Sequence, residues 1–228
     1  MNTKAVLFLV NGFKMTRLLP TELSAYLEAL VPKRSPELQA MEVDARKTNF
    51  PIIGPTSGHL CYLIAKMIGA RRIFELGSGF GYSTAFFAKA VQDNGGGVVN
   101  HVVWDAKLSK KAKRHLSALG FNDVVKYHVC EAVEALRSAE ESFDLIFNDI
   151  DKEAYPDALP IIEAKLKPGG VLIVDNMLWS GRVFDPSDKS PETRAILELS
   201  HMLTASPHWT SALVPIRDGL MVAFKEPK

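Results

Sequence analysis

The stretch IFELGSGFG, residues 73–81, decides the fold of this chain. Its first part contains the apolar residues Ile73, Phe74 and Leu76 and predicts a short buried strand. The three glycines that follow predict a tight turn, and the next residues, up to about Val91, have the pattern of a helix. A strand, a glycine turn and a helix in this order are typical of an open α/β sheet that binds a ligand beside the turn.

The same alternation of strands and helices continues to the end of the chain. Further strands are expected at residues 98–104, 124–129, 143–148, 171–174, 210–215 and 220–224. The last two are joined by residues 216–219, which carry a hairpin turn signal. We therefore expect an α/β fold with a doubly wound, Rossmann-like, seven-stranded sheet. This sheet is mostly parallel, with an antiparallel C-terminal hairpin strand and helices on both faces.

The N-terminal part has a different pattern. Residues 1–70 are expected to form a helical cover and a lead-in loop that belong to the same domain as the core, residues 71–228. The apolar run at residues 5–10 is too short to span a bilayer or to serve as a signal peptide. Met15 is an alternative start of the protein.

Composition excludes several classes of function. Lys and Arg total 27 and Asp and Glu total 26, so the net charge of +1 creates no global field that attracts nucleic acid or anionic membrane. The two cysteines, Cys61 and Cys130, form neither a disulfide framework nor a CxxC metal site. This cysteine usage fits a reducing compartment and predicts a cytoplasmic protein.

Acidic side chains follow two of the expected strands. Asp149 and Asp151 come after residues 143–148, and Asp175 and Asn176 come after residues 171–174. The carboxyl ends of parallel strands meet at one edge of a sheet, so these side chains should lie close together. Carboxylates so close repel each other unless a cation neutralises them. The cluster therefore requires a divalent metal, the neighbouring Lys152, or both.

The glycine loop and the end of the next strand indicate a nucleoside ligand. Asp105 is positioned to accept the hydroxyls of a ribose, and Ser83 could offer a hydroxyl at a helix start. The spacing is not that of a dinucleotide or phosphate loop, which favours a ligand without a pyrophosphate. Simpler interpretations remain open: a tight turn at the glycines, a helix cap at Asp175-Asn176 and a solvated Lys152.

Three segments resemble the cation-dependent O-methyltransferases, the class I enzymes that use S-adenosylmethionine and include catechol and caffeoyl-CoA O-methyltransferases. They are ELGSGFGYS at residues 75–83, FDLIFNDIDK at 143–152 and LKPGGVLIVDNMLWSGR at 166–182. The segment VPIRDGL at 214–220 resembles the closing hairpin of that family. The resemblance covers about residues 48–224.

The resemblance implies a role for each matching residue. Those matched to the S-adenosylmethionine site are Ile53, Glu75, Gly77, Ser78, Ser83, Asp105, Ala132, Asp149 and Asp151. Those matched to the metal ligands are Asp149, Asp175 and Asn176, whose oxygens suit Mg²⁺ best, or Mn²⁺ or Ca²⁺. Lys152 and Asp149 match catalytic positions, and Lys152 and Ser180 match the substrate side. The chain departs from the family at Trp104-Asp105-Ala106-Lys107, at the lengthened loop 94–97 and at Cys130.

The expected activity is therefore transfer of the S-adenosylmethionine methyl group to a hydroxyl of a small catechol-like or vicinal-diol aromatic substrate. The resemblance also implies a homodimer, with no membrane partner. Two alternatives stay open: methylation of a hydroxylated nucleoside in RNA, and a non-catalytic S-adenosylmethionine-binding module. The neutral net charge argues against RNA, although the basic helix around Lys110 and Arg114 argues for it.

Overall fold

The computed structural model describes residues 18–227, so the apolar run at residues 5–10 and the alternative start Met15 lie outside the described residues. The α-helices are α1 (Thr21–Ala29), α2 (Pro36–Thr48), α3 (Gly54–Met67), α4 (Tyr82–Asp93), α5 (Ala106–Ala118), α6 (Ala132–Ser138), α7 (Tyr155–Lys165) and α8 (Pro191–Ala205). The strands are β1 (Arg72–Leu76), β2 (Val98–Val103), β3 (Val125–Val129), β4 (Phe143–Asn148), β5 (Leu166–Val174), β6 (Trp209–Val214) and β7 (Leu220–Lys225). Two 3₁₀ segments are η1 (Lys152–Ala154) and η2 (Trp179–Phe184).

The strands form one seven-stranded sheet in the order β3-β2-β1-β4-β5-β7-β6. The first five pair in parallel, and β7 pairs antiparallel with both β5 and β6. The predicted mixed sheet is confirmed. The hairpin does not simply add an antiparallel edge, however, because β7 lies inside the sheet and β6 forms its edge.

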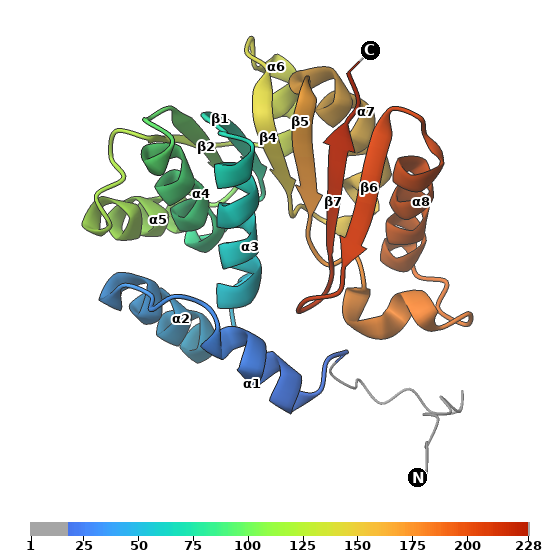
Figure 1. The fold of residues 1–228 in the computed structure, drawn as a ribbon, viewed down its shortest axis with the longest axis horizontal. Coiled ribbons are helices and arrows are strands. Elements are labelled where there is room, and N and C mark those ends of the chain that lie inside the picture. Colours follow the sequence, from blue (N-terminus) through green and yellow to red (C-terminus); the bar gives the residue numbers. More distant parts are fainter. Residues whose placement is uncertain (1–17, 228) are drawn as a thin grey trace.

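Helices cover both faces of the sheet, as expected for alternating strands and helices (Figure 1). One face packs against α3, α4 and α5 through a core that contains Phe87, Leu116 and Phe147. The other face packs against α6, α7 and α8 through a core that contains Phe74, Tyr155 and Leu199. Strands buried on both faces are near-continuous apolar runs, which explains why the sequence pattern located them. None of the described helices has the length and apolar character needed to cross a bilayer.

The N-terminal helices lie at the end of the sheet where the β6–β7 hairpin turns and η2 is found (Figure 1). Ser35 caps α2, because its side-chain oxygen accepts the Leu38 N–H at 3.2 Å. Helix α2 is tied to the core by a 2.8 Å hydrogen bond from the Tyr82 hydroxyl to Glu42. His115 of α5 adds a 2.6 Å contact to Glu37. The predicted boundary between the helical cover and the core of this single domain, at residue 70, stays a prediction.

Two boundaries differ from the sequence expectation. The fifth strand was expected at residues 171–174, but β5 begins at Leu166, which pairs with Phe143 of β4. A register irregularity in β4, between Phe143 and Leu145, accommodates the Pro-Gly-Gly segment within the strand. Strand β2 ends at Val103, one residue earlier than expected, and Asp105 becomes the cap of α5.

Candidate active site

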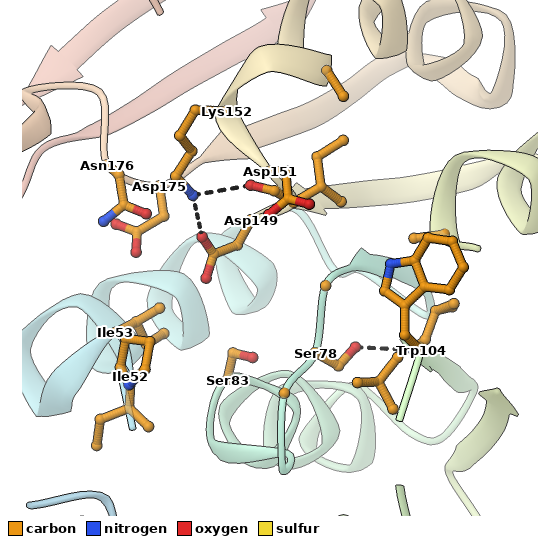
Figure 2. A pocket seen from close by; sticks show the side chains of 18 of the residues that line it. Ile52, Ile53, Ser78, Ser83, Trp104, Asp149, Asp151, Lys152, Asp175 and Asn176 are labelled. Atoms are coloured by element: carbon orange, nitrogen blue, oxygen red, sulfur yellow. Dashed lines mark hydrogen bonds and ion pairs between the residues drawn. The ribbon is translucent and has the colours of Figure 1, made fainter. Parts of the chain in front are cut away.

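A cavity of about 880 Å³ lies where β1, β2, β4 and β5 end, as expected for an open α/β sheet. Its volume is large enough for a cofactor together with a small substrate. Figure 2 shows the residues that line it, with Asp149 between the pair Asp175 and Asn176 on one side and Trp104 on the other.

The glycine loop after β1 is held against two neighbouring strands. Ser78 donates its N–H to the Val102 carbonyl and accepts the Val102 N–H on its hydroxyl, both at 2.9 Å. Gly77 has a φ of +87°, and a Cβ there would lie 2.4 Å from the Asp149 carbonyl oxygen. Only glycine fits, so the loop expected to bind the cofactor directly contacts the first residue of the acidic cluster.

Glu75 lies beneath this loop and is fully buried. Thr84, in the first turns of α4, donates its hydroxyl to Glu75 Oε2 at 2.5 Å, and His101 Nδ1 lies 3.0 Å from the same hydroxyl. Burial raises the pKa of Glu75 to about 7. Glu75 Oε1 is buried without a hydrogen-bond partner, and Glu75 does not line the cavity.

The opposite end of the cavity contains two ion pairs. Lys152 Nζ lies 2.8 Å from Asp149 Oδ1 and donates to the Ile150 carbonyl at 3.1 Å (Figure 2). Arg217 Nη1, from the β6–β7 turn, lies 3.0 Å from Asp175 Oδ2. Burial raises the pKa of Asp149, and burial together with the nearby Asp149 charge raises the pKa of Asp175 to about 6. Each carboxylate is thus paired with its own basic side chain.

Asp218 fixes the loop that follows β5. Its carboxylate accepts the Asn176 Nδ2–H at 3.1 Å and the Ser180 backbone N–H at 2.5 Å. Main-chain bonds from Met177 to Gly219 (3.1 Å) and from Leu178 to Asp218 (2.8 Å) join the same two segments. Because the amide nitrogen of Asn176 is engaged, its oxygen is left for another ligand.

The three predicted metal ligands fit a hard divalent cation. Asp175 Oδ1 is buried and has no hydrogen-bond partner, Asn176 has a free amide oxygen, and Asp149 lies beside them. All three offer oxygen atoms, the donors that Mg²⁺ and Ca²⁺ prefer. Residues 18–227 contain no group of three or more His, Cys, Asp or Glu side chains placed to hold a metal, so this site has only two charged ligands.

Most of the predicted site residues are brought together. Those that line the cavity are Ile53, Gly77, Ser78, Ser83, Ala132, Asp149, Asp151, Lys152, Asp175 and Asn176. Three lie elsewhere: Glu75 is buried below the glycine loop, Ser180 is exposed in η2, and Asp105 caps α5. Asp105 accepts the Lys107 N–H at 2.6 Å and does not line the cavity, so its expected contact with a ribose has no support here.

Arg217 and Trp104 are among the residues that line the cavity but had no individual role in the sequence analysis. Arg217 belongs to the hairpin segment 214–220, which was noted only as a whole. Trp104 was noted only as a departure from the family pattern. The sequence signal for Arg217 was a basic residue next to Asp218 in the hairpin that pairs with β5. Its ion-pair partner, Asp175, is 42 residues away, so no local pattern predicted the contact.

This sheet order, with a glycine loop after β1 and acids after β4 and β5, defines a Rossmann-like transferase fold with its site at the strand ends. The O-methyltransferase family model matches residues 22–226, and the chain belongs to that family. The predicted family is thereby confirmed as O-methyltransferases, while dependence on a cation stays a prediction.

Individual relatives agree with this assignment. A Mycobacterium avium protein named as an O-methyltransferase is 30% identical over 176 residues, which cover 76% of this chain and 78% of the relative. The O-methyltransferase of Bacillus cereus, solved with S-adenosylhomocysteine (SAH), has a TM-score of 0.81 at 25% identity and covers 90% of this chain and 98% of its own. The O-methyltransferase TomG of Streptomyces achromogenes has the same fold, with a TM-score of 0.81 at 24% identity, covering 90% and 96%.

Proposed function

We propose that this chain transfers the methyl group of S-adenosylmethionine to a hydroxyl of a small catechol-like or vicinal-diol aromatic substrate, assisted by a divalent cation. The observation that carries the proposal is the arrangement of Asp149. Its carbonyl oxygen adjoins the glycine loop, and its carboxylate lies beside Lys152 and Asp175 in the same cavity. Cofactor, cation and acceptor would therefore meet at one residue.

The cofactor would occupy the side of the cavity formed by the glycine loop. Its ammonium group would have an acidic partner in Asp151, which lines the cavity. Ser83, in the first turn of α4, offers a hydroxyl near a helix start, where a carboxylate is stabilised. The bound sulfonium supplies an electrophilic methyl carbon.

The acceptor would occupy the side of the cavity formed by Asp175, Asn176 and Lys152. A cation held by Asp149, Asp175 and Asn176 would lower the pKa of a hydroxyl bound to it. Lys152 offers Nζ to the same oxygen, either to take its proton or to stabilise the negative charge left there. In the transfer, the oxygen–carbon bond forms as the sulfur–carbon bond breaks, and SAH leaves as the second product. The residues contribute mainly by alignment of the reactants.

The test is methyl transfer from labelled S-adenosylmethionine to a panel of caffeate-like diols and, separately, to bulk tRNA, with and without EDTA. We expect labelled diols, loss of turnover by more than about 100-fold with EDTA, and recovery with Mg²⁺. Full activity of the metal-free protein would reject the cation. Labelling of tRNA alone would reject the diol, and labelling of neither despite cofactor binding would favour a binding module.

A further inference from the structure

The end of β2 presents apolar groups to the cavity. Val103, the last residue of the strand, and Trp104, which follows it, both line the cavity. Asp105, the next residue, uses its carboxylate to cap α5 through the Lys107 N–H. The position from which an acid would reach a ribose in an open α/β sheet is therefore occupied by a valine.

No neighbouring acid replaces it among the described residues that line the cavity. Glu131, after β3, lines the cavity, but its Oε1 accepts the Val133 N–H at 2.9 Å and its Oε2 accepts the Glu134 N–H at 2.5 Å. Its carboxylate is thus used to cap α6. The remaining acids that line the cavity follow β4 (Asp149, Asp151 and Glu153), follow β5 (Asp175) or lie in α8 (Glu192).

The same part of the cavity contains a large aromatic surface that is not covered by the protein. Trp104 is 70% exposed although it lines the cavity, and its indole lies across Asp149 from Asn176 (Figure 2). None of the ring–ring or cation–ring contacts found among residues 18–227 involves it. A planar base that covers this ring would gain stacking and remove apolar surface from water.

We infer that this chain holds the adenosine half of its cofactor by stacking on Trp104, with no carboxylate on the ribose hydroxyls, and therefore accepts cofactors that lack a ribose hydroxyl. The inference rests on the proposed use of S-adenosylmethionine. Stacking recognises the face of the base, whereas a carboxylate would recognise the hydroxyls. The protein should therefore discriminate little between cofactors that differ only in their ribose hydroxyls.

The first experiment compares ligands on the unmodified protein. Calorimetry measures the affinity of SAH and of its 2′-deoxy and 3′-deoxy counterparts. We expect the three dissociation constants to agree within about threefold, because a hydroxyl bonded to a carboxylate would contribute about 10-fold or more. A loss of about tenfold or more for either deoxy ligand overturns the inference. If SAH itself does not bind, the proposed cofactor fails and the inference fails with it.

The second experiment changes the residues. Trp104→Ala is expected to weaken SAH about 10- to 100-fold, while Trp104→Phe, which keeps an aromatic ring, stays within about threefold. Unchanged affinity in a folded Trp104→Ala protein overturns the stacking. Circular dichroism checks whether the variant is folded. If it is unfolded, the inference is tested by the comparison of SAH with its deoxy counterparts on the unmodified protein.

A gain of selectivity provides the complementary test. Val103→Asp places a carboxylate at the end of β2 and is expected to tighten SAH about tenfold while leaving the 3′-deoxy ligand unchanged. Val103→Asn, of the same size without the charge, is the matched control. Equal affinities for both ligands in a folded Val103→Asp protein would show that the ribose lies elsewhere and overturn the inference.

Discussion

At the β4–β5 end of the cavity, Asp149 and Asp175 each form an ion pair with a basic side chain, whereas at the β2–β3 end Val103, Trp104 and Ala132 present mostly apolar atoms. Charged groups act over distance and require counter-charges, so substitutions among them should have large effects. Apolar contacts depend on area and tolerate change in the ligand. On the proposed function, the chain should be selective at the reacting centre and permissive at the adenosine.

The largest effect is expected at the charged end. Asp149→Asn removes the negative charge of a proposed metal ligand and the ion pair of Lys152 while keeping the size of the side chain. We expect methyl transfer to fall by about 10³-fold or more, close to 4 kcal/mol of transition-state stabilisation. The measurement is labelled methyl transfer at saturating cofactor, with the exposed Asp123→Asn as the control. Activity within about tenfold of the unmodified protein would contradict the role.

The next effect concerns stability and pH. Burial raises the pKa of Glu75 to about 7, above its value of about 4.5 when unfolded. The protonated form is therefore favoured by folding, and the protein loses stability as pH rises from about 4.5 to about 7. Glu75→Gln removes this loss, so the variant should gain about 3 kcal/mol relative to the unmodified protein across that range.

Urea unfolding at several pH values without ligand measures this difference, with the exposed Glu198→Gln as the control. The same pH dependence in the Glu75→Gln protein would contradict the assignment.

A smaller effect is expected at Arg217. Its guanidinium occupies Asp175 Oδ2, so a divalent cation must compete with it for that carboxylate. Arg217→Gln should bind Mn²⁺ about tenfold more tightly, a gain of about 1.4 kcal/mol. Electron paramagnetic resonance of free Mn²⁺ measures the affinity, with the exposed Arg194→Gln as the matched control. Equal affinities would show that Arg217 does not compete, and binding by neither protein would reject the cation site itself.

The smallest effect tests the apolar end. Adenosine alone should bind with an affinity that changes by less than about twofold between about 0.1 and about 1 M NaCl, because no charge pairs with it there. SAH, whose amino-acid part is proposed to lie near Asp151, should weaken more over the same range. A strong salt dependence for adenosine would reveal a charged contact in this region.

The sequence predicted the charged end well because it depends on strand ends. The apolar runs 143–148 and 171–174 were clear, and parallel strands bring their following residues together, so Asp149 and Asp175 were placed correctly in one cavity. At the apolar end the boundary of β2 differs from the expected one for a local reason. Side chains alternate along a strand, and β2 ends one residue before the expected position, which leaves Asp105 on the helix it caps.

Other features depend on contacts between distant segments. Arg217 reaches Asp175 only because β7 inserts between β5 and β6, and no local pattern specifies that order. The sequence also did not predict the start of β5. The Pro-Gly-Gly segment at residues 168–170 is typical of a turn, but pairing with β4 keeps it within the strand.

The hydrogen bonds by which Asp218 and Gly219 fix the loop after β5 have a consequence for biosynthesis. Asn176, Ser180, Met177 and Leu178 are all held by Asp218 or Gly219, near the C-terminal end of the chain. The glycine loop is synthesised some 140 residues earlier, as the positions of Gly77 and Asp218 show. A ribosome-bound nascent chain would therefore carry the loop after β5 without these contacts until the hairpin emerges. Premature termination before the hairpin would leave one edge of β5 unpaired and that loop without the residues that fix it.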